Sequence, residues 1–182
     1  SAPYVFTKMM RPLVKLWRSK GLKVVVYLDD GICALQNEIE AIRASSWVKE
    51  TLAKAGWVYN GLKSIWQPTC KLEWLGFDLN LGQGCISVPL RKISRLKAML
   101  TMAAKQTTLR AKFIASLVGK IISMSIALGP VSRFMTRALY WLLETRGSWC
   151  EFLTVTKEAQ EELVFWVECL QCAAYMAQSI GT

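Results

Sequence analysis

The chain has 182 residues, of which 53% are hydrophobic and 20% are charged. This composition excludes a disordered tail and supplies enough apolar material for the core of one domain, or of a domain with a small appendage. Histidine is absent, which excludes Ser-His-Asp and Cys-His nucleophile systems and histidine-based metal sites, and the formal charge of +10 favours a polyanionic partner.

The positive charge is concentrated in one segment. Residues 87–147 carry eleven basic side chains and one acidic one, whereas residues 148–182 carry one basic and five acidic side chains. An ordinary solvated helix face is one interpretation of the basic segment. The uniform sign favours the other interpretation, a surface that follows the phosphates of a nucleic acid.

The cysteines and the apolar stretches bear on the compartment. The six cysteines are irregularly spaced, which favours reduced thiols in an intracellular, reducing compartment and does not distinguish cytoplasm from nucleus. Cys169 and Cys172 have CxxC spacing, but no second pair follows, so two packed thiols are favoured over a zinc or redox site. The apolar stretch 113–132 is interrupted by Lys120 and Gly129-Pro130, which predicts a buried helix and no membrane partner.

The first half of the chain has mixed patterns. Apolar residues at helical spacing predict a helix over 4–20 that Gly21 can end. The β-branched run 23–28 predicts a buried strand, and residues 32–35 can return as its partner after a tight turn. Asn37 and Glu40 resemble a capping box, which predicts a helix closed by Gly56.

Two more turns are expected before Pro89. Asn60-Gly61 is a turn signal between the short runs 57–59 and 64–66, and Gly82-Gln83-Gly84 separates the predicted strands 72–79 and 85–88. After Pro89 the pattern becomes helical, with apolar stripes in four predicted helices, over 90–100, 109–125, 131–143 and 156–177. Residues 1–88 are therefore interpreted as α+β and residues 89–182 as all-helical, with a domain break near Pro89.

The candidate site lies at the first hairpin. Asp29 and Asp30 are adjacent carboxylates in the turn Asp29-Asp30-Gly31, at the end of an apolar strand. Their mutual repulsion is costly unless a cation or a basic group is near, and carboxylate oxygens together with substrate phosphates suit Mg²⁺. A plain hairpin turn that uses Asp and Gly for their turn propensity is the alternative.

These residues are part of a larger resemblance. Residues 24–30, Val-Val-Val-Tyr-Leu-Asp-Asp, resemble motif C of reverse transcriptases, the Tyr-x-Asp-Asp box. Three further motifs of that family are matched in order: the end of motif B by residues 1–7, motif D by residues 56–64, and motif E, the primer grip, by residues 72–77.

The extent of this resemblance sets the expected architecture. It covers residues 1–88 closely and residues 89–146 more loosely. Within the family, the sequence is similar to the reverse transcriptases of DIRS/Ngaro-type tyrosine-recombinase retrotransposons. It implies an α+β chain with a partial polymerase palm, in which an antiparallel sheet packs with helices, followed by helical segments. The implied domains are a palm part at 1–88, a thumb at 89–146 and a connection at 147–182.

The resemblance also implies roles for single residues. Asp29 would bind metal and Asp30 would shape the same site, where two Mg²⁺ ions activate the primer 3′-hydroxyl and hold the triphosphate. Lys63 would be the general acid for the pyrophosphate leaving group, with a surface lysine on a turn as the alternative.

Nucleic-acid contacts follow from the same motifs. Tyr27 would contact the primer–template near its end, and the primer grip would consist of Trp74, Leu75 and Gly76, although simple hairpin packing also explains Trp74 and Leu75. The pocket beneath the templating pair would be formed by Ala2, Pro3 and Phe6. The thumb helices would track the duplex with six basic residues: Arg91, Lys92, Arg95, Lys97, Arg110 and Lys112.

The implied function is RNA-directed DNA polymerisation, with an RNA or DNA template, its primer and deoxynucleoside triphosphates as partners. The motif A strand and the fingers would lie upstream in the same polyprotein. The chain is therefore expected to be a fragment that is inactive alone, because one metal-binding carboxylate is missing. The alternatives are a non-catalytic nucleic-acid-binding remnant that uses its basic helices and, as a weaker idea, a helical interaction protein that docks through 150–180.

Overall fold

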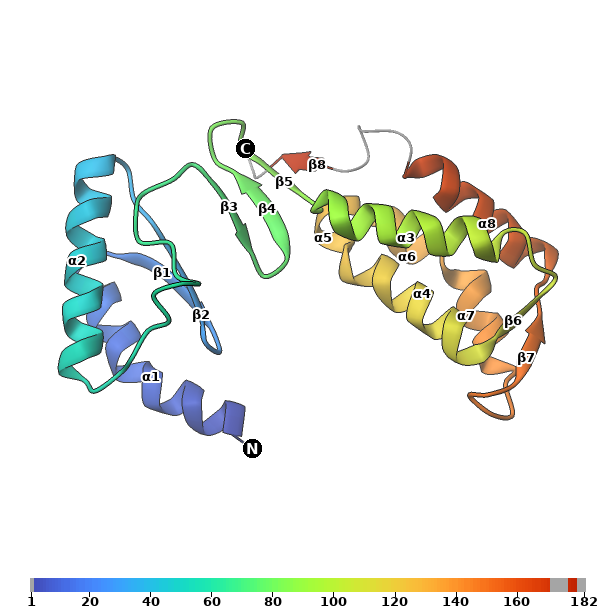
Figure 1. Cartoon of the computed structure of the whole chain (residues 1–182), viewed down its shortest axis with the longest axis horizontal. Coiled ribbons are helices and arrows are strands. Elements are labelled where there is room, and N and C mark those ends of the chain that lie inside the picture. Colours follow the sequence, from blue (N-terminus) through green and yellow to red (C-terminus); the bar gives the residue numbers. More distant parts are fainter. Residues whose placement is uncertain (1, 171–176, 180–182) are drawn as a thin grey trace. The chain divides into compact units, whose positions relative to one another are not determined.

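The computed structural model describes residues 2–170 and 177–179 and has two compact units, 1–70 and 71–182 (Figure 1). Each unit has its own hydrophobic core. Helices combined with small antiparallel sheets confirm the predicted α+β class. The units divide after Cys70, so residues 71–88 belong with the helical part of the chain, whereas the sequence places a domain break near Pro89.

The first unit is a strand hairpin packed with two helices. Its elements are α1 (Ala2–Ser19), β1 (Lys23–Tyr27), β2 (Asp30–Ala34) and α2 (Glu38–Lys54). Each of them was expected from the sequence, to within a few residues at the ends. In the core, Leu13 and Trp17 of α1 pack with Val24 of β1, and the Trp17 indole Nε1 donates a hydrogen bond to the Thr51 hydroxyl of α2 at 2.8 Å.

The start of α2 confirms the predicted cap. Asn37 has an extended backbone, and its side-chain oxygen accepts from the Glu40 amide at 2.9 Å, which satisfies one of the unpaired donors of the first turn. At the other end, Gly56 takes a φ of 76°, a left-handed conformation that ends helices at little cost for glycine.

The turn expected at Asn60-Gly61 forms, but the runs 57–59 and 64–66 on either side of it are not paired strands. Residues 57–70 contain turns and no strand. The Asn60 carbonyl accepts from the amides of Lys63 and Ser64, and its side-chain oxygen accepts from Leu62 and Lys63. These local bonds satisfy the backbone within a compact turn, in competition with a strand ladder.

The second unit begins with a sheet in the antiparallel order β3-β4-β5-β8. Its strands are β3 (Lys71–Trp74), β4 (Phe77–Asn80), β5 (Cys85–Ser87) and β8 (Ala177–Ser179). The single strand expected over 72–79 is therefore a hairpin, whose loop residues Leu75 and Gly76 have φ values of 48° and 77°. Positive φ at both loop positions is typical of a type I′ turn, and leucine in the first of them gives little sequence signal for it.

The remainder of the unit is mainly helical. Its helices are α3 (Leu90–Ala103), α4 (Ala111–Ser123), α5 (Ser125–Leu128), α6 (Val131–Phe134), α7 (Arg137–Glu144) and α8 (Lys157–Cys169). Two short strands pair within it, β6 (Thr108–Arg110) and β7 (Phe152–Thr154). The segment is therefore not all-helical, contrary to the prediction. Leu96, Leu117, Leu139 and Trp166 are fully buried and join α3, α4, α7 and α8 in one core.

Two predicted helices are shorter than expected. The helix over 131–143 is divided at Met135 and Thr136, where the buried Thr136 hydroxyl donates to the Ser132 carbonyl at 2.8 Å and replaces helical backbone bonding. The helix over 156–177 ends at Cys169, and Ala177–Ser179 pairs with β5. Cys172 lies outside the described residues, so the CxxC prediction stays untested.

Over the described part of the chain, no helix combines the length and apolar character needed to cross a membrane. The apolar stretch 113–132 forms parts of α4, α5 and α6, in which Leu117, Ile121 and Leu128 are buried in the core, as predicted for a buried segment.

Candidate functional site

The tip of the β1–β2 hairpin carries the two adjacent carboxylates. Tyr27 pairs with Asp30, so the loop consists of Leu28 and Asp29 alone, and Asp30 belongs to β2. The sequence placed the turn one residue later, at Asp29-Asp30-Gly31. Leu28 has a φ of 53° and Asp29 has a negative φ, which is the sign pattern of a type II′ turn. A leucine in that conformation is strained, and such strain is often found at functional sites.

Both carboxylates are open to solvent. Asp29 and Asp30 are exposed, and within the described residues neither carboxylate forms a hydrogen bond or ion pair. Unpaired carboxylate oxygens at a tight tip fit the donor set that Mg²⁺ takes in proteins. In residues 2–170 and 177–179 no group of three acidic, cysteine or histidine side chains is placed to hold a metal, so these two acids would need a ligand from elsewhere.

Tyr27 and Lys63 are accessible in the same unit. Tyr27 is 59% exposed and, as the pairing partner of Asp30, lies on the same face of the hairpin. Lys63 is exposed in the turn built on Asn60, to which its amide donates a hydrogen bond. The structure therefore leaves both side chains available for contacts, as their predicted roles require.

The predicted pocket residues lie on the first half of α1. Ala2 and Pro3 are exposed, and the Pro3 carbonyl accepts from the Thr7 hydroxyl at 2.9 Å. Phe6 is half-buried and packs edge-to-face on Trp57, with ring centroids 5.0 Å apart. Phe6 thus has a packing role in addition to any contact with a base pair.

In the second unit, the predicted primer grip is the β3–β4 turn. Leu75 projects at the turn and is 39% exposed, whereas Trp74 is half-buried. The Trp74 indole Nε1 is buried with no hydrogen-bond partner within the described residues. Of the three predicted residues, Leu75 is therefore the one whose side chain is presented at the surface.

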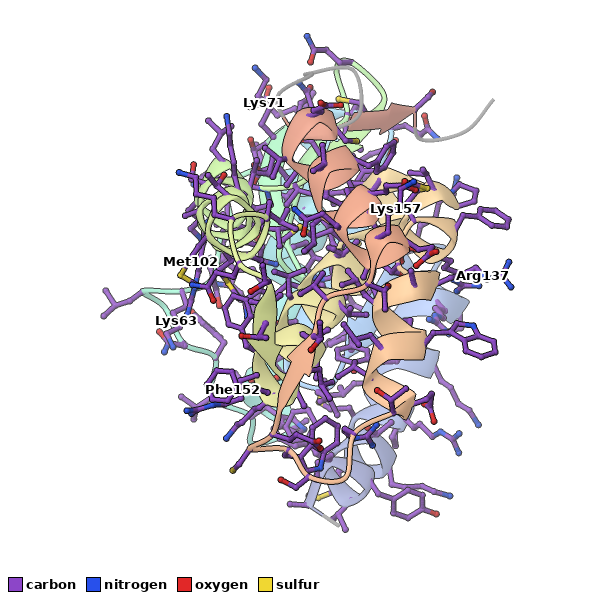
Figure 2. The ribbon with its side chains drawn as sticks, turned by 90° about the vertical axis from the view of Figure 1, so that its right-hand side faces the viewer. Lys63, Lys71, Met102, Arg137, Phe152 and Lys157 are labelled. Atoms are coloured by element: carbon purple, nitrogen blue, oxygen red, sulfur yellow. The ribbon has the colours of Figure 1, made fainter. Side chains whose placement is uncertain are left out.

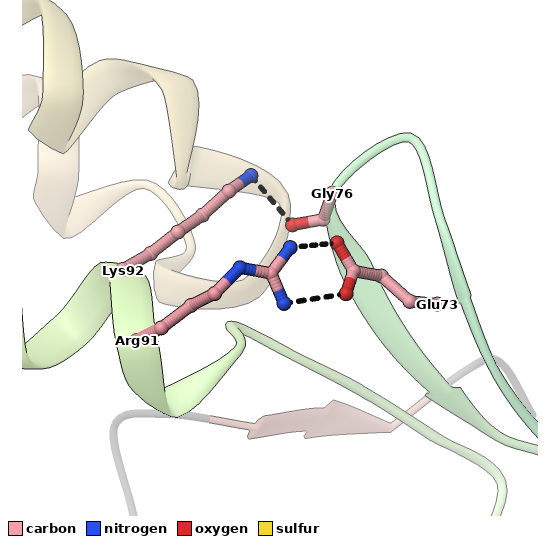
Figure 3. Close-up of polar contacts among 4 residues, drawn as sticks. All are labelled: Glu73, Gly76, Arg91 and Lys92. Carbon is pink, nitrogen blue, oxygen red and sulfur yellow. Dashed lines mark hydrogen bonds and ion pairs between the residues drawn. The ribbon is translucent and has the colours of Figure 1, made fainter.

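Two basic residues of α3 hold this turn in place (Figure 3). The Arg91 guanidinium binds both carboxylate oxygens of Glu73, one of them at 2.6 Å, and Lys92 Nζ donates to the Gly76 carbonyl at 2.7 Å. A side chain at Gly76 would displace Lys92, because a Cβ there would lie 2.1 Å from its Nζ. Arg91 and Lys92, expected to contact nucleic acid, thus form a clamp between the turn and α3, which we call the turn clamp.

Pairing changes the acid–base properties of the turn clamp. The hydrogen bonds from Arg91 lower the pKa of Glu73, and those with Glu73 raise the pKa of Arg91. Because the carboxyl pKa is lowered in the folded state, the stabilising contribution is present above the ordinary pKa of glutamate. It is lost as the pH falls through the lowered value.

Charge reversal tests the turn clamp. Arg91→Glu is expected to speed amide hydrogen exchange in β3 and β4 several-fold, because two carboxylates would then face each other. The effect should be modest, since the Arg91 side chain is 65% exposed and solvent-exposed pairs contribute little. The double variant with Glu73→Arg is expected to restore slow exchange, and equal exchange in all three proteins would contradict the clamp.

Solved structures of known proteins resemble this chain. No protein-family model and no curated protein matches the chain. A solved structure of the foamy viral protease-reverse transcriptase in complex with RNA/DNA hybrid matches with a TM-score of 0.71 and 19% identity, over 94% of this chain and 21% of that one. The foamy viral protease-reverse transcriptase dRH in complex with ds DNA matches with a TM-score of 0.68 and 20% identity, over 93% of this chain and 27% of that one.

The chain has a reverse-transcriptase-like fold. It spans roughly a quarter of the length of these two neighbours. The expectation of such a fold, drawn from four short motifs, is confirmed, while the DIRS/Ngaro affiliation and the roles of single residues stay predictions.

Within this reverse-transcriptase-like fold, the other predicted cations lie along two helices. Arg95 is exposed on α3, and Lys97 borders a hollow of about 680 Å³ on the same helix, lined also by Ser94, Ala98, Thr101, Met102, Lys105 and Gln106. Arg110 and Lys112 are exposed at the start of α4. These four residues, unlike Arg91, have no acidic partner within the described residues.

Glu73 is the site residue that sequence reasoning missed. It lies in the segment that resembles motif E. Only the reversal of the chain after β5, with Pro89 at the start of α3, brings Arg91 to it. Arg91 lies 18 residues further along the chain and in a different element, so no local sequence signal joins the two residues.

Proposed function

We propose that this chain is part of an RNA-directed DNA polymerase of the DIRS/Ngaro retrotransposon type, which extends a primer on a template. The observation that carries the proposal is the pair of exposed, unpartnered carboxylates, Asp29 and Asp30, at a strained hairpin tip in a reverse-transcriptase-like fold. In this proposal residues 1–88 are part of a palm, 89–146 a thumb and 147–182 a connection.

In the proposed reaction the primer 3′-hydroxyl oxygen attacks the α-phosphorus of a deoxynucleoside triphosphate. A new P–O bond forms, the bond to pyrophosphate breaks, and the hydroxyl proton is released. Asp29 and Asp30 would hold two Mg²⁺ ions together with a carboxylate from outside this chain, and the metal would supply charge neutralisation and a more acidic hydroxyl. Lys63 donates a proton to the leaving pyrophosphate.

The remaining residues position the nucleic acid in this proposal. Tyr27 and the Leu75 turn contact the primer end, while Arg95, Lys97, Arg110 and Lys112 follow the phosphates. Arg91 and Lys92 act on the primer through the turn clamp, by fixing the β3–β4 turn to α3.

The test is primer extension by a protein assembled from this chain and an upstream reverse-transcriptase segment that carries a third carboxylate. With Mg²⁺, a primer–template and deoxynucleotides, we expect extension. We expect this chain alone to bind the primer–template without extending it. Absence of extension from every assembled protein that folds and binds primer–template would contradict the proposal.

A non-catalytic nucleic-acid-binding module is the second candidate. The absence of a third metal-binding carboxylate within the described residues favours it. It predicts that a plot of log K against log salt concentration falls with a slope of about 0.7–0.9 for each phosphate contact. It also predicts that binding does not depend on Asp29 or Mg²⁺.

A further inference from the structure

The loop between α7 and β7 folds back on the start of α4. The Ala111 amide donates to the Glu151 carbonyl at 2.8 Å, and the Lys112 amide donates to the Trp149 carbonyl at 3.1 Å. Strand pairing sets Arg110 opposite Phe152. Two aromatic residues distant in sequence are thereby brought beside two basic residues of α4 and β6.

An arginine guanidinium lies over each of these two aromatic rings. The Arg110 guanidinium lies 5.1 Å from the centroid of the Phe152 ring, and that of Arg146 lies 4.0 Å from the Trp149 ring. Phe152 is nevertheless 60% exposed and Trp149 is 51% exposed. Figure 2 shows Phe152 at the surface beside the paired strands β6 and β7. A guanidinium covers one face of a ring at most, so ring surface remains for another planar group.

The acid in this loop is directed at the loop itself. The Glu151 carboxylate accepts from the amides of Gly147 at 2.6 Å and Ser148 at 3.2 Å, which holds the loop in its folded form. Its charge is thus engaged by backbone donors, while Arg110, Lys112 and Arg146 supply three positive charges around the two rings. The local field favours an anionic partner.

We propose that Arg110, Lys112, Arg146, Trp149 and Phe152, the arginine–aromatic surface, bind single-stranded nucleic acid. Exposed aromatic rings stack on unpaired bases of any sequence, and neighbouring cations neutralise the phosphates between them. In a duplex the bases are already stacked on each other, so rings of this kind discriminate in favour of unpaired strands. This surface goes beyond the proposed polymerase chemistry, which concerns the paired primer end.

Fluorescence anisotropy tests the proposal with labelled oligodeoxythymidylate and a blunt duplex of equal length. The double variant Trp149→Ala/Phe152→Ala is expected to weaken single-strand binding about tenfold or more for each ring, and duplex binding much less. Its salt dependence should match that of the parent, because rings neutralise no phosphates. Lys112→Gln should instead reduce the slope of log K against log salt by about 0.7.

Matched variants separate stacking from folding and from general charge. Trp141→Ala removes another exposed tryptophan, on α7, and is expected to bind both ligands like the parent. Trp149→Phe with Phe152→Tyr keeps both rings and should retain single-strand binding. Unchanged single-strand affinity in the double alanine variant, an equal loss with Trp141→Ala, or full displacement by polyglutamate would overturn the proposal. None of these measurements needs Mg²⁺ or extension, so they stand apart from the test of polymerase activity.

Discussion

Replacing Asp29 with asparagine in the assembled polymerase is expected to lower the rate of primer extension at least about 100-fold. The change keeps the shape of the side chain and removes the negative charge that would hold Mg²⁺. Metal-ion stabilisation of transition-state charge contributes several kcal/mol, and each 1.36 kcal/mol is a factor of ten in rate. Because Asp29 is exposed and without a hydrogen-bond partner within the described residues, the substitution should leave folding stability and primer–template affinity nearly unchanged.

The matched control for this prediction is Glu38→Gln. Glu38 is also an exposed carboxylate of the first unit, in the first turn of α2, and its loss should not slow extension. Asp30→Asn is expected to reduce the rate as well, and by a smaller factor, because Asp30 shapes the site beside the ligand. Single-turnover extension rates at saturating nucleotide provide the measurement. Undiminished extension by Asp29→Asn would contradict metal binding by Asp29 and the assignment of the catalytic site to this hairpin tip.

Local chemistry accounts for most of what the sequence predicted correctly. The β-branched run before Asp29 marks a strand, although the strand was expected to be buried and only Val24 of β1 is. Asn37 marks a helix start and Gly56 marks its end, and each signal lies within a few residues of the element it specifies. The reverse-transcriptase-like fold was recognised because four such local segments occur in the order of the family's motifs.

Long-range contacts account for the errors. The strand at Ala177–Ser179 depends on its pairing with the edge strand β5. Arg91 resembles a solvated cation until the β3–β4 hairpin brings Glu73 to it. In each case the deciding partner is remote in sequence, and hydrophobic periodicity contains no information about it.

Replacing Trp166 with alanine is expected to lower the free energy of unfolding by about 3–5 kcal/mol, the typical cost of removing a large aromatic side chain from a core. Trp166 of α8 is fully buried, packs edge-to-face on Phe165 with centroids 5.2 Å apart, and its Nε1 donates to the Met135 carbonyl between α6 and α7. Nearby, Glu162 accepts from the amides of Ala138 and Leu139 at 2.8 and 3.0 Å. The acidic C-terminal helix therefore anchors α6 and α7 and is integral to the core of the second unit.

Two further variants show which part of Trp166 matters. Trp166→Phe keeps most of the apolar volume but leaves the Met135 carbonyl without its indole donor, so its expected cost is smaller, about 1–3 kcal/mol. Val164→Ala, at a residue of the same helix that is 42% exposed, should change stability by no more than about 0.5 kcal/mol. Urea denaturation of the full chain, followed by far-ultraviolet circular dichroism, measures all three. If Trp166→Ala were no more destabilising than Val164→Ala, α8 would be a peripheral connection. The remaining helices alone would then set the spacing of the basic residues on α3 and α4.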